Sequence, residues 1–321
     1  MKLLTKLTPI AATVLLSLGA VSTASADDGF KLSDKLSVTG FIDMSLLYVD
    51  ADGSSSSTDS GLDQFEIDFL YSFDDKLTAQ VDLEYQNSEV DIEQAFINYA
   101  VTDQFSVKAG RFLSYSGWET EEPTGLFQYS GTGYAPFFYG YYQQGISGLY
   151  SGDGYALAVS IVNDLSSPES TDSEDPGIET MIALMPTDEI TIKGFYSTDK
   201  LAGTDETTEM INLWASYSEG PLTLAAEFNT SEYTSMAAAD ASGYLLMANY
   251  AFDTFALTVR YHDYEVENSA GVTWEDKSAI TIAPSFAVND YLLMVFEYRM
   301  DSDDISDIDS DSFAIEALVT F

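Results

Sequence analysis

The residues with the clearest chemical potential in this sequence are acidic side chains placed at every second position. Asp82 and Glu84 alternate with Val81, Leu83 and Tyr85. Carboxylates attract cations, and their hard oxygen atoms suit Ca²⁺ or Mg²⁺. The whole chain holds 53 acidic and only 12 basic residues. We therefore expect no nucleic-acid partner, because phosphate binding needs a basic face.

The single histidine, His262, is the residue to test for catalysis. A Ser–His mechanism requires a nucleophile that the histidine activates, and no local motif marks one. Cysteine is absent, which excludes thiol catalysis and disulfides. We therefore expect His262 to be an interface or interior residue, and we expect neither enzymatic activity nor a cofactor.

A second acidic group, residues 301–311, has the sequence DSDDISDIDSD. Its clustered carboxylates suit a divalent cation, but the segment lacks the glycine and the closing glutamate of an EF-hand. We interpret it as a solvated acidic loop. Loose bridging to anionic lipopolysaccharide through divalent ions is the alternative.

The alternation that contains Asp82 and Glu84 indicates β-strands with one apolar and one polar face. Phe65, Ile67 and Phe69 likewise alternate with Glu66 and Asp68. These runs extend over ten residues or more, whereas strands of soluble sandwiches usually have about five or six. A tilted strand needs about 9–11 residues to cross a bilayer. The pattern predicts an all-β transmembrane barrel.

The N-terminus is typical of an exported protein. Lys2 and Lys6 precede an apolar stretch over residues 10–21, and the small residues Ala24-Ser25-Ala26 follow. This order predicts a signal peptide over 1–26 that is cleaved after Ala26. The mature chain, 27–321, then has a net charge of −43, because the signal holds two lysines and no acids.

Short turns and longer polar connections alternate along the mature chain. Seven short turns and eight longer connections predict sixteen antiparallel strands in an up-and-down barrel, with both termini at the short-turn side. Sixteen strands leave room for a water-filled bore. The expected strands are 35–50, 62–73, 76–87, 90–101, 104–113, 143–151, 154–163, 177–186, 188–198, 207–218, 221–230, 242–252, 254–265, 277–288, 290–300 and 312–321.

The strand pattern also predicts which charged residues face the bore, because the apolar residues face outward. The expected inward acids are Asp43, Glu66, Asp68, Asp82, Glu84, Glu227, Glu297 and Glu316. The expected inward bases are Lys108, Lys193, Arg260 and Arg299. Arg111 has the opposite parity to Lys108 and joins them only if a bulge or the strand end redirects it. Such charges would favour cations in the bore. The alternative for each residue taken alone is an ordinary solvated side chain with little effect on selectivity.

The longest connection, 114–142, contains ten aromatic residues and the acids Glu119, Glu121 and Glu122. A connection this long usually has a function. Because the segment is too aromatic for free solvation, we expect it to fold into the barrel and constrict the pore. An external flap, or strand ends in the aromatic girdle, is the alternative.

Residues 107–164 resemble the putative β-barrel porin family. The resemblance rests on Val107-Lys108-Ala109-Gly110-Arg111-Phe112, on Gly117 with Glu119, on Gly145-Ile146-Ser147-Gly148-Leu149-Tyr150, and on Val162-Asn163-Asp164. It covers about a fifth of the chain. The last strand, from Phe313 to Phe321, also looks like the terminal signature that the barrel-assembly machinery recognises.

The resemblance implies a porin in the outer membrane of a Gram-negative bacterium, in contact with lipid and lipopolysaccharide. It further implies a homotrimer. We expect a passive diffusion channel for small hydrophilic solutes and ions that prefers cations. A solute-selective channel and a non-conducting surface or adhesion barrel remain as alternatives.

Overall fold

The structure is a computed structural model that describes residues 30–86, 89–119, 122–165, 170–171, 174–200, 207–232 and 239–321. The expected signal peptide lies outside these residues. The described chain forms one two-residue strand and sixteen long strands: β1 (Phe30–Lys31), β2 (Leu36–Ala51), β3 (Ser57–Ser72), β4 (Leu77–Gln86), β5 (Glu89–Ala100), β6 (Phe105–Leu113), β7 (Tyr142–Gly152), β8 (Tyr155–Val162), β9 (Gly177–Thr187), β10 (Ile190–Lys200), β11 (Thr207–Glu219), β12 (Leu222–Glu232), β13 (Ala239–Ala251), β14 (Ala256–Asn268), β15 (Thr273–Ala287), β16 (Leu292–Asp303) and β17 (Ile308–Thr320).

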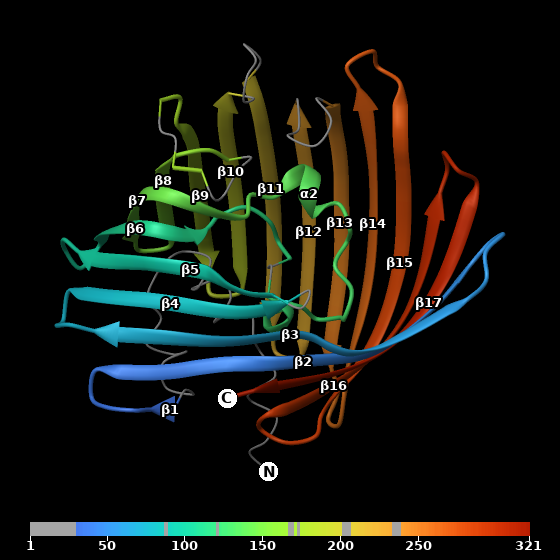
Figure 1. The fold of residues 1–321 in the computed structure, drawn as a ribbon, viewed down its shortest axis with the longest axis horizontal. Coiled ribbons are helices and arrows are strands. Elements are labelled where there is room, and N and C mark those ends of the chain that lie inside the picture. Colours follow the sequence, from blue (N-terminus) through green and yellow to red (C-terminus); the bar gives the residue numbers. More distant parts are fainter. Residues whose placement is uncertain are drawn as a thin grey trace.

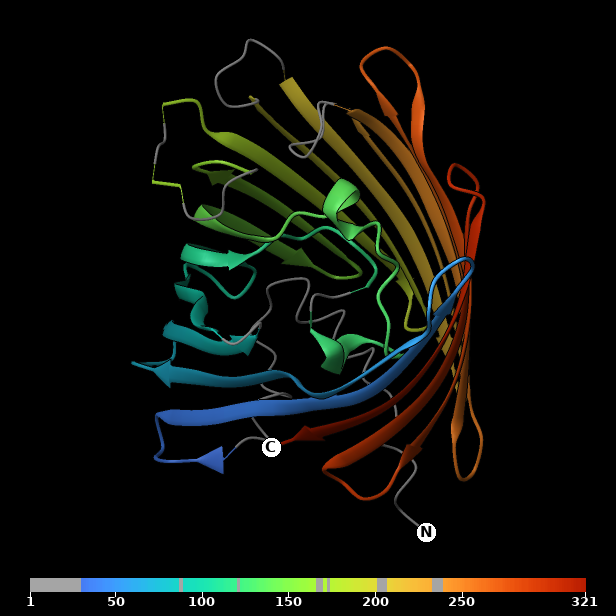
Figure 2. The same cartoon turned by 45° about the vertical axis from the view of Figure 1, so that its right-hand side comes forward.

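The long strands close into a single antiparallel barrel (Figures 1 and 2). Each pairs with its neighbours in the chain, and β17 pairs with β2 in a register that runs from Ser310 opposite Ala51 to Thr320 opposite Phe41. At the seam, the backbones of Gly40 and Phe321 exchange two hydrogen bonds of 3.0 Å. Closure leaves no free edge, and it confirms the predicted sixteen-stranded up-and-down barrel.

The two faces of the strands differ as the alternation predicts. In β8, Leu157, Val159 and Ile161 are exposed on the outside, whereas Ala158 and Ser160 are buried on the inside. The same holds around the barrel, where many of the large exposed side chains are apolar. An exterior this apolar is unfavourable in water and suits the hydrocarbon layer of a membrane.

Aromatic rings gather on the outside near the short turns. Tyr150 stacks on Tyr155 with ring centroids 6.0 Å apart, and Phe255 stacks between Phe252 and Phe286 at 4.6 and 5.8 Å. Such a belt is where aromatic side chains meet a membrane–water interface.

Several strands extend beyond the expected boundaries, so that some connections are shorter than predicted. Most of the expected acidic loop 301–311 is strand, because the pairing of β16 with β17 continues to Asp303 opposite Ile308. Only residues 304–307 turn, and Asp307 adopts a φ of 55° there. The acids therefore stand on a hairpin rather than in a loose loop.

The connection between β6 and β7 holds the two helical turns of the described chain, η2 (Pro123–Gly125) and α2 (Ala135–Phe138). None of the helices in the described residues is long and apolar enough to cross a bilayer. Figure 2 shows α2 and the green chain around it within the ring of strands. Whether this segment constricts the bore as expected therefore depends on the residues that it contacts.

Candidate functional site inside the barrel

The aromatic part of the β6–β7 connection packs on inward residues of β13 and β14. Tyr134, Phe137, Phe138 and Tyr139 are buried in one cluster. The wall contributes to this cluster with Leu245, Met247, Tyr264 and Val266. Burial of this much apolar surface stabilises the segment against the wall.

Sequence reasoning missed this apolar part of the wall. In β13, Leu245 and Met247 point inward while Leu246 is half exposed outside. A strand that is apolar on both faces was the available signal, since a wall that meets only water would carry polar residues. Gly243, on the same inward row, lies beneath Phe138, and a Cβ there would approach its ring to 2.9 Å.

A buried ion pair fixes the start of the segment to β14. Arg260 donates a hydrogen bond of 2.5 Å to Glu119, and the two side chains are 0% and 7% exposed. Gln128 and the backbone N–H of Thr132 also donate to Glu119, each at 3.0 Å. Arg260 further donates to the carbonyl of Ser130 at 2.6 Å. The pair is thus supported by additional hydrogen bonds, which a buried ion pair requires.

Glu227 of β12 binds the segment at a second point. It accepts hydrogen bonds from the backbone N–H of Trp118 at 2.7 Å, from Tyr134 at 2.6 Å and from Tyr139. Asn212 of β11 donates to the same carboxylate at 2.5 Å. Four donors around one buried carboxylate hold both ends of the aromatic cluster in place.

Glu297 and Arg299 of β16 form a third point. Glu297 accepts a hydrogen bond from the backbone N–H of Ser130 at 3.0 Å. Arg299 donates to the carbonyl of Gly131 at 2.6 Å and pairs with Asp301. The arginines predicted to face the bore therefore contact the segment.

The two predicted lysines lie near the beginning of the segment, where Lys108 is close to Tyr115 and Lys193 is close to Trp214, which packs on Trp118. The ammonium group of Lys108 lies 4.7 Å from the ring centroid of Phe96. That of Lys193 lies 5.2 Å from the ring of Trp214, and the residue is 1% exposed. Both positions allow cation–π attraction. Between them Glu179 accepts hydrogen bonds from Ser114 and Ser160, each at 2.8 Å.

His262 lies on the same inward row as Arg260 and is 1% exposed. Its ring lies 5.8 Å from that of Tyr134, nearly perpendicular to it. The histidine is therefore covered by the segment.

The opposite wall, from β2 to β5, is acidic. Asp82 accepts hydrogen bonds from Gln80 at 2.9 Å and from Gln94 at 2.7 Å, and Thr39 donates to Asp68 at 2.8 Å. Asp43 and Glu316 meet across the seam region and are both buried. Glu121 lies outside the described residues.

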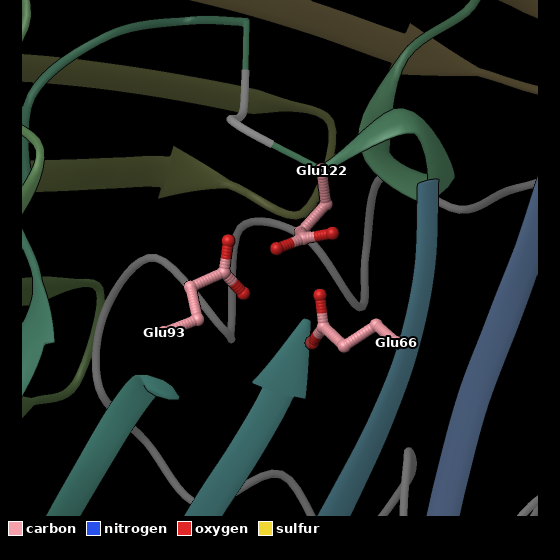
Figure 3. Close-up of side chains that lie close together, drawn as sticks. All are labelled: Glu66, Glu93 and Glu122. Carbon is pink, nitrogen blue, oxygen red and sulfur yellow. The ribbon is translucent and has the colours of Figure 1, made fainter. Parts of the chain in front are cut away.

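Glu122 reaches this acidic wall from the segment. Oxygen atoms of Glu122, Glu66 and Glu93 all lie within 4.8 Å of one another, and Figure 3 shows the three carboxylates directed at a common space. A second group of this kind joins Glu66 to Asp68 and Asp82. Among the described residues the acids of 301–311 form no such group. Burial and the neighbouring charge of Glu93 raise the pKa of Glu122 well above its usual value.

Glu93 was not predicted to face inward, and a β-bulge explains why. The register shifts where Asp82 pairs with Gln94 and Leu83 with Ile92, which leaves Glu93 as the extra residue. A bulge redirects side chains. The signal in the sequence was the pair of polar residues at 93 and 94, which interrupts the alternation between Ile92 and Ala95. Asp63 is the extra residue of a similar bulge in β3.

Arg111 and Glu84 line a cavity of about 420 Å³ that Glu93 and Tyr142 also line. Arg111 follows Gly110, whose φ of 132° is one that other residues rarely adopt. Arg111 is also the last residue of β6 that pairs with β5. The strand end therefore brings Arg111 to the cavity that Glu93 also lines, despite its parity.

Comparison with known proteins agrees with this architecture. Residues 63–321 match the family described as Putative beta-barrel porin-2, OmpL-like. No curated protein sequence matches the chain.

Solved porin structures share the fold at low sequence identity. OmpF of Salmonella typhi, solved in complex with daunomycin, has a TM-score of 0.71 and 18% identity, with 89% of this chain and 97% of that chain covered. The outer membrane channel DcaP of Acinetobacter baumannii has a TM-score of 0.69 and 13% identity over 91% and 99% of the two chains. An anion-selective porin from Comamonas acidovorans has a TM-score of 0.68 and 14% identity over 89% and 99%.

The family match spans most of the chain, and the barrel is the one that outer-membrane channels share. This chain therefore belongs to the OmpL-like family of putative β-barrel porins and has the fold of an outer-membrane channel.

Proposed function

We propose that this barrel is a passive diffusion channel for small hydrophilic solutes and ions, and that the segment 114–142 constricts it. The observation that carries the proposal is the attachment of this segment to inward side chains of β12, β14 and β16 through Glu227, Arg260 and Glu297. A segment held this way narrows the bore. Solutes then diffuse through the remaining water-filled space.

The channel prefers cations because acidic side chains outnumber basic ones inside the barrel. Arg260 and Lys193 are buried beneath or beside the constricting segment, and Arg260 is neutralised by Glu119. Asp43, Asp82 and Glu66 stand on the wall that faces them. Because the inward acids outnumber the inward bases, and because Arg260 and Arg299 are paired with acids, the field in the bore is negative and concentrates cations.

Single-channel recording in planar bilayers tests the proposal. We expect ohmic steps and, under a KCl gradient, a reversal potential with the sign of a cation-preferring pore. Asp82→Asn should shift this potential toward zero, whereas Asp253→Asn in an exposed turn should leave it unchanged.

Other outcomes would replace the proposal. A barrel that is correctly folded and gives no conductance is a surface or adhesion barrel. Conductance that one class of solute blocks at low concentration identifies a solute-selective channel. A reversal potential of the opposite sign contradicts the cation preference alone.

We further propose the route by which the chain reaches the membrane. Export removes residues 1–26, and the barrel-assembly machinery binds the C-terminal strand that ends at Phe321. The barrel then assembles as a homotrimer among lipid and lipopolysaccharide. The mass of the mature chain and the mass of the native particle in detergent test cleavage and assembly separately. An uncleaved chain or a monomer would contradict the respective step.

A further inference from the structure

Three carboxylates from three separate parts of the chain converge on the acidic wall. Glu66 comes from β3, Glu93 from the bulge in β5, and Glu122 from the constricting segment just before η2. Their oxygen atoms lie within 4.8 Å of one another, and the side chains point to one space (Figure 3). Residues this far apart in sequence meet here only because the segment lies inside the barrel.

Two of these carboxylates are buried, and each has one oxygen atom without a hydrogen-bond partner. Glu66 and Glu93 are each 4% exposed, and the Oε2 atom of each has no hydrogen-bond partner in the described chain. Within the described residues neither forms an ion pair with a basic side chain. Buried carboxylates are normally paired with a base or bound to a metal ion. An unpartnered oxygen atom on each of two buried carboxylates therefore favours the binding of a cation between them.

The third carboxylate is held in position to complete the group. Tyr142 donates a hydrogen bond of 2.9 Å to one oxygen of Glu122, and Gln64 donates one of 3.5 Å to the other. Gln64 precedes Glu66 by two residues and lies on the same inward row of β3. These contacts orient Glu122 toward the wall.

The spacing fits a hard divalent cation. Ca²⁺ binds carboxylate oxygens at about 2.3–2.6 Å, so two oxygens on opposite sides of one ion are separated by about 5 Å. Ca²⁺ also tolerates irregular geometry and fills the remaining positions with water, whereas Mg²⁺ requires a nearly ideal octahedron. The adjoining cavity of about 420 Å³ provides room for such waters.

We propose that Glu66, Glu93 and Glu122 form a binding site for one divalent cation of the Ca²⁺ type. The ion links the constricting segment to β3 and β5, on the side opposite its attachment through Arg260. It also removes negative charge from the bore, so that its binding reduces the cation preference. The site depends on side-chain geometry alone and does not require that the barrel conducts.

Calcium titration of the full-length folded barrel in detergent tests the site. After removal of metal with EDTA, binding of Tb³⁺ is followed by luminescence sensitised by nearby aromatic residues, and Ca²⁺ is added as competitor in about 0.3 M KCl to screen diffuse attraction. We expect one saturable site per chain. If the wild-type protein shows no saturable binding, the proposal is wrong, whether or not the barrel conducts.

Matched variants locate the site. Glu93→Gln and Glu122→Gln should each weaken Ca²⁺ binding by about tenfold or more, since affinity depends on the number of charged ligands. Glu316→Gln removes another buried lumen carboxylate, outside this group, and should change the affinity by less than about twofold. Equal affinity in all three variants contradicts the assignment.

A thermal measurement keeps the test informative if a variant is less stable. Ca²⁺ should raise the Tm of the wild-type barrel and of Glu316→Gln but not that of Glu93→Gln, because only an ion that binds the folded state stabilises it. Heat-modifiable migration in SDS gels shows whether each variant is folded. A Ca²⁺-dependent rise in the Tm of folded Glu93→Gln would contradict the site.

Discussion

Arg260 of β14 and Glu119 of the constricting segment form an ion pair of 2.5 Å, and both side chains are buried. The residues are 141 positions apart in the chain. Their contact joins the β6–β7 connection to the opposite side of the barrel and neutralises a base that would otherwise face the bore.

Removal of one member of this pair should release the segment. Arg260→Met leaves Glu119 buried with only neutral donors, a change that typically costs about 3–5 kcal/mol. We expect proteolysis within 114–142 and larger current fluctuations. The double variant Glu119→Gln with Arg260→Met should recover part of the loss, as a double-mutant cycle would quantify.

An exposed ion pair provides the control for this experiment. Lys200 pairs with Asp175 at 2.9 Å, and both side chains are more than half exposed. Lys200→Met should change the free energy of unfolding by less than about 1 kcal/mol. If Arg260→Met behaves like this control, the pair does not hold the segment.

The absence of a side chain at Gly243 should be as important for the position of the segment as the ion pair of Arg260 with Glu119. A Cβ at this position would lie 2.9 Å from the ring of Phe138 and 2.8 Å from Tyr264. Gly243→Val should therefore displace the aromatic cluster, at a cost of about 1–3 kcal/mol for overpacking. Protection of the segment from protease measures the effect. A Cβ at Gly61 would have no atom within 4 Å, so Gly61→Val should leave the segment protected.

Alkaline pH should weaken the docking of the segment. Burial raises the pKa of Tyr115 from 10.0 to about 12, and burial also raises the pKa of Tyr134 and Tyr139. The folded state therefore holds these protons more tightly than the unfolded state. Their contribution to stability is complete below pH 10 and is lost as the pH rises from there through the folded pKa values.

Absorbance at about 295 nm follows the ionisation of tyrosine with its pKa near 10. We expect a late phase in the titration that becomes smaller in the combined Tyr134→Phe and Tyr139→Phe variant, in which Tyr115 still ionises late, together with loss of protease protection at high pH in the wild type. A titration in which all tyrosines ionise together near pH 10 would contradict the burial of these rings.

A charged residue at the centre of a strand, on the outer face, should destabilise the barrel. Val159 lies on the outside of β8 and is 53% exposed. Val159→Arg should destabilise the barrel in lipid by about 2–4 kcal/mol, because the charge enters the hydrocarbon layer. Urea unfolding in lipid vesicles measures the loss. Asp153→Arg, in the exposed turn before β8, is the control and should have little effect. Equal stability of the two variants would place β8 outside the membrane.

The sequence alone determines the barrel. Alternation of residues such as Leu157, Val159 and Ile161 with small or polar neighbours encodes both faces of a strand, because side chains on a strand point to opposite sides with a period of two. The spacing of turns gives the number of strands, and the parity identifies Asp82, Arg260 and Glu297 as inward residues. These features are local, so they can be read one strand at a time.

The strand ends were less predictable. The extension of β16 and β17 toward residues 304–307 depends on backbone pairing between two acidic stretches, and no hydrophobic pattern marks it. The bulge at Glu93 left only a two-residue break in the alternation, and this break became meaningful once the partner strand was known.

Only the tertiary structure decided how the inward charges are used. The sequence assigned Arg260 and Glu119 to the same interior but could not show that they neutralise each other, or that Glu66, Glu93 and Glu122 meet. These contacts join residues from strands and a long connection, and their geometry depends on how closed pairing and aromatic packing position the segment. Alternation specifies the direction of a side chain, whereas a binding site requires the distance between side chains, which is set by the closed barrel.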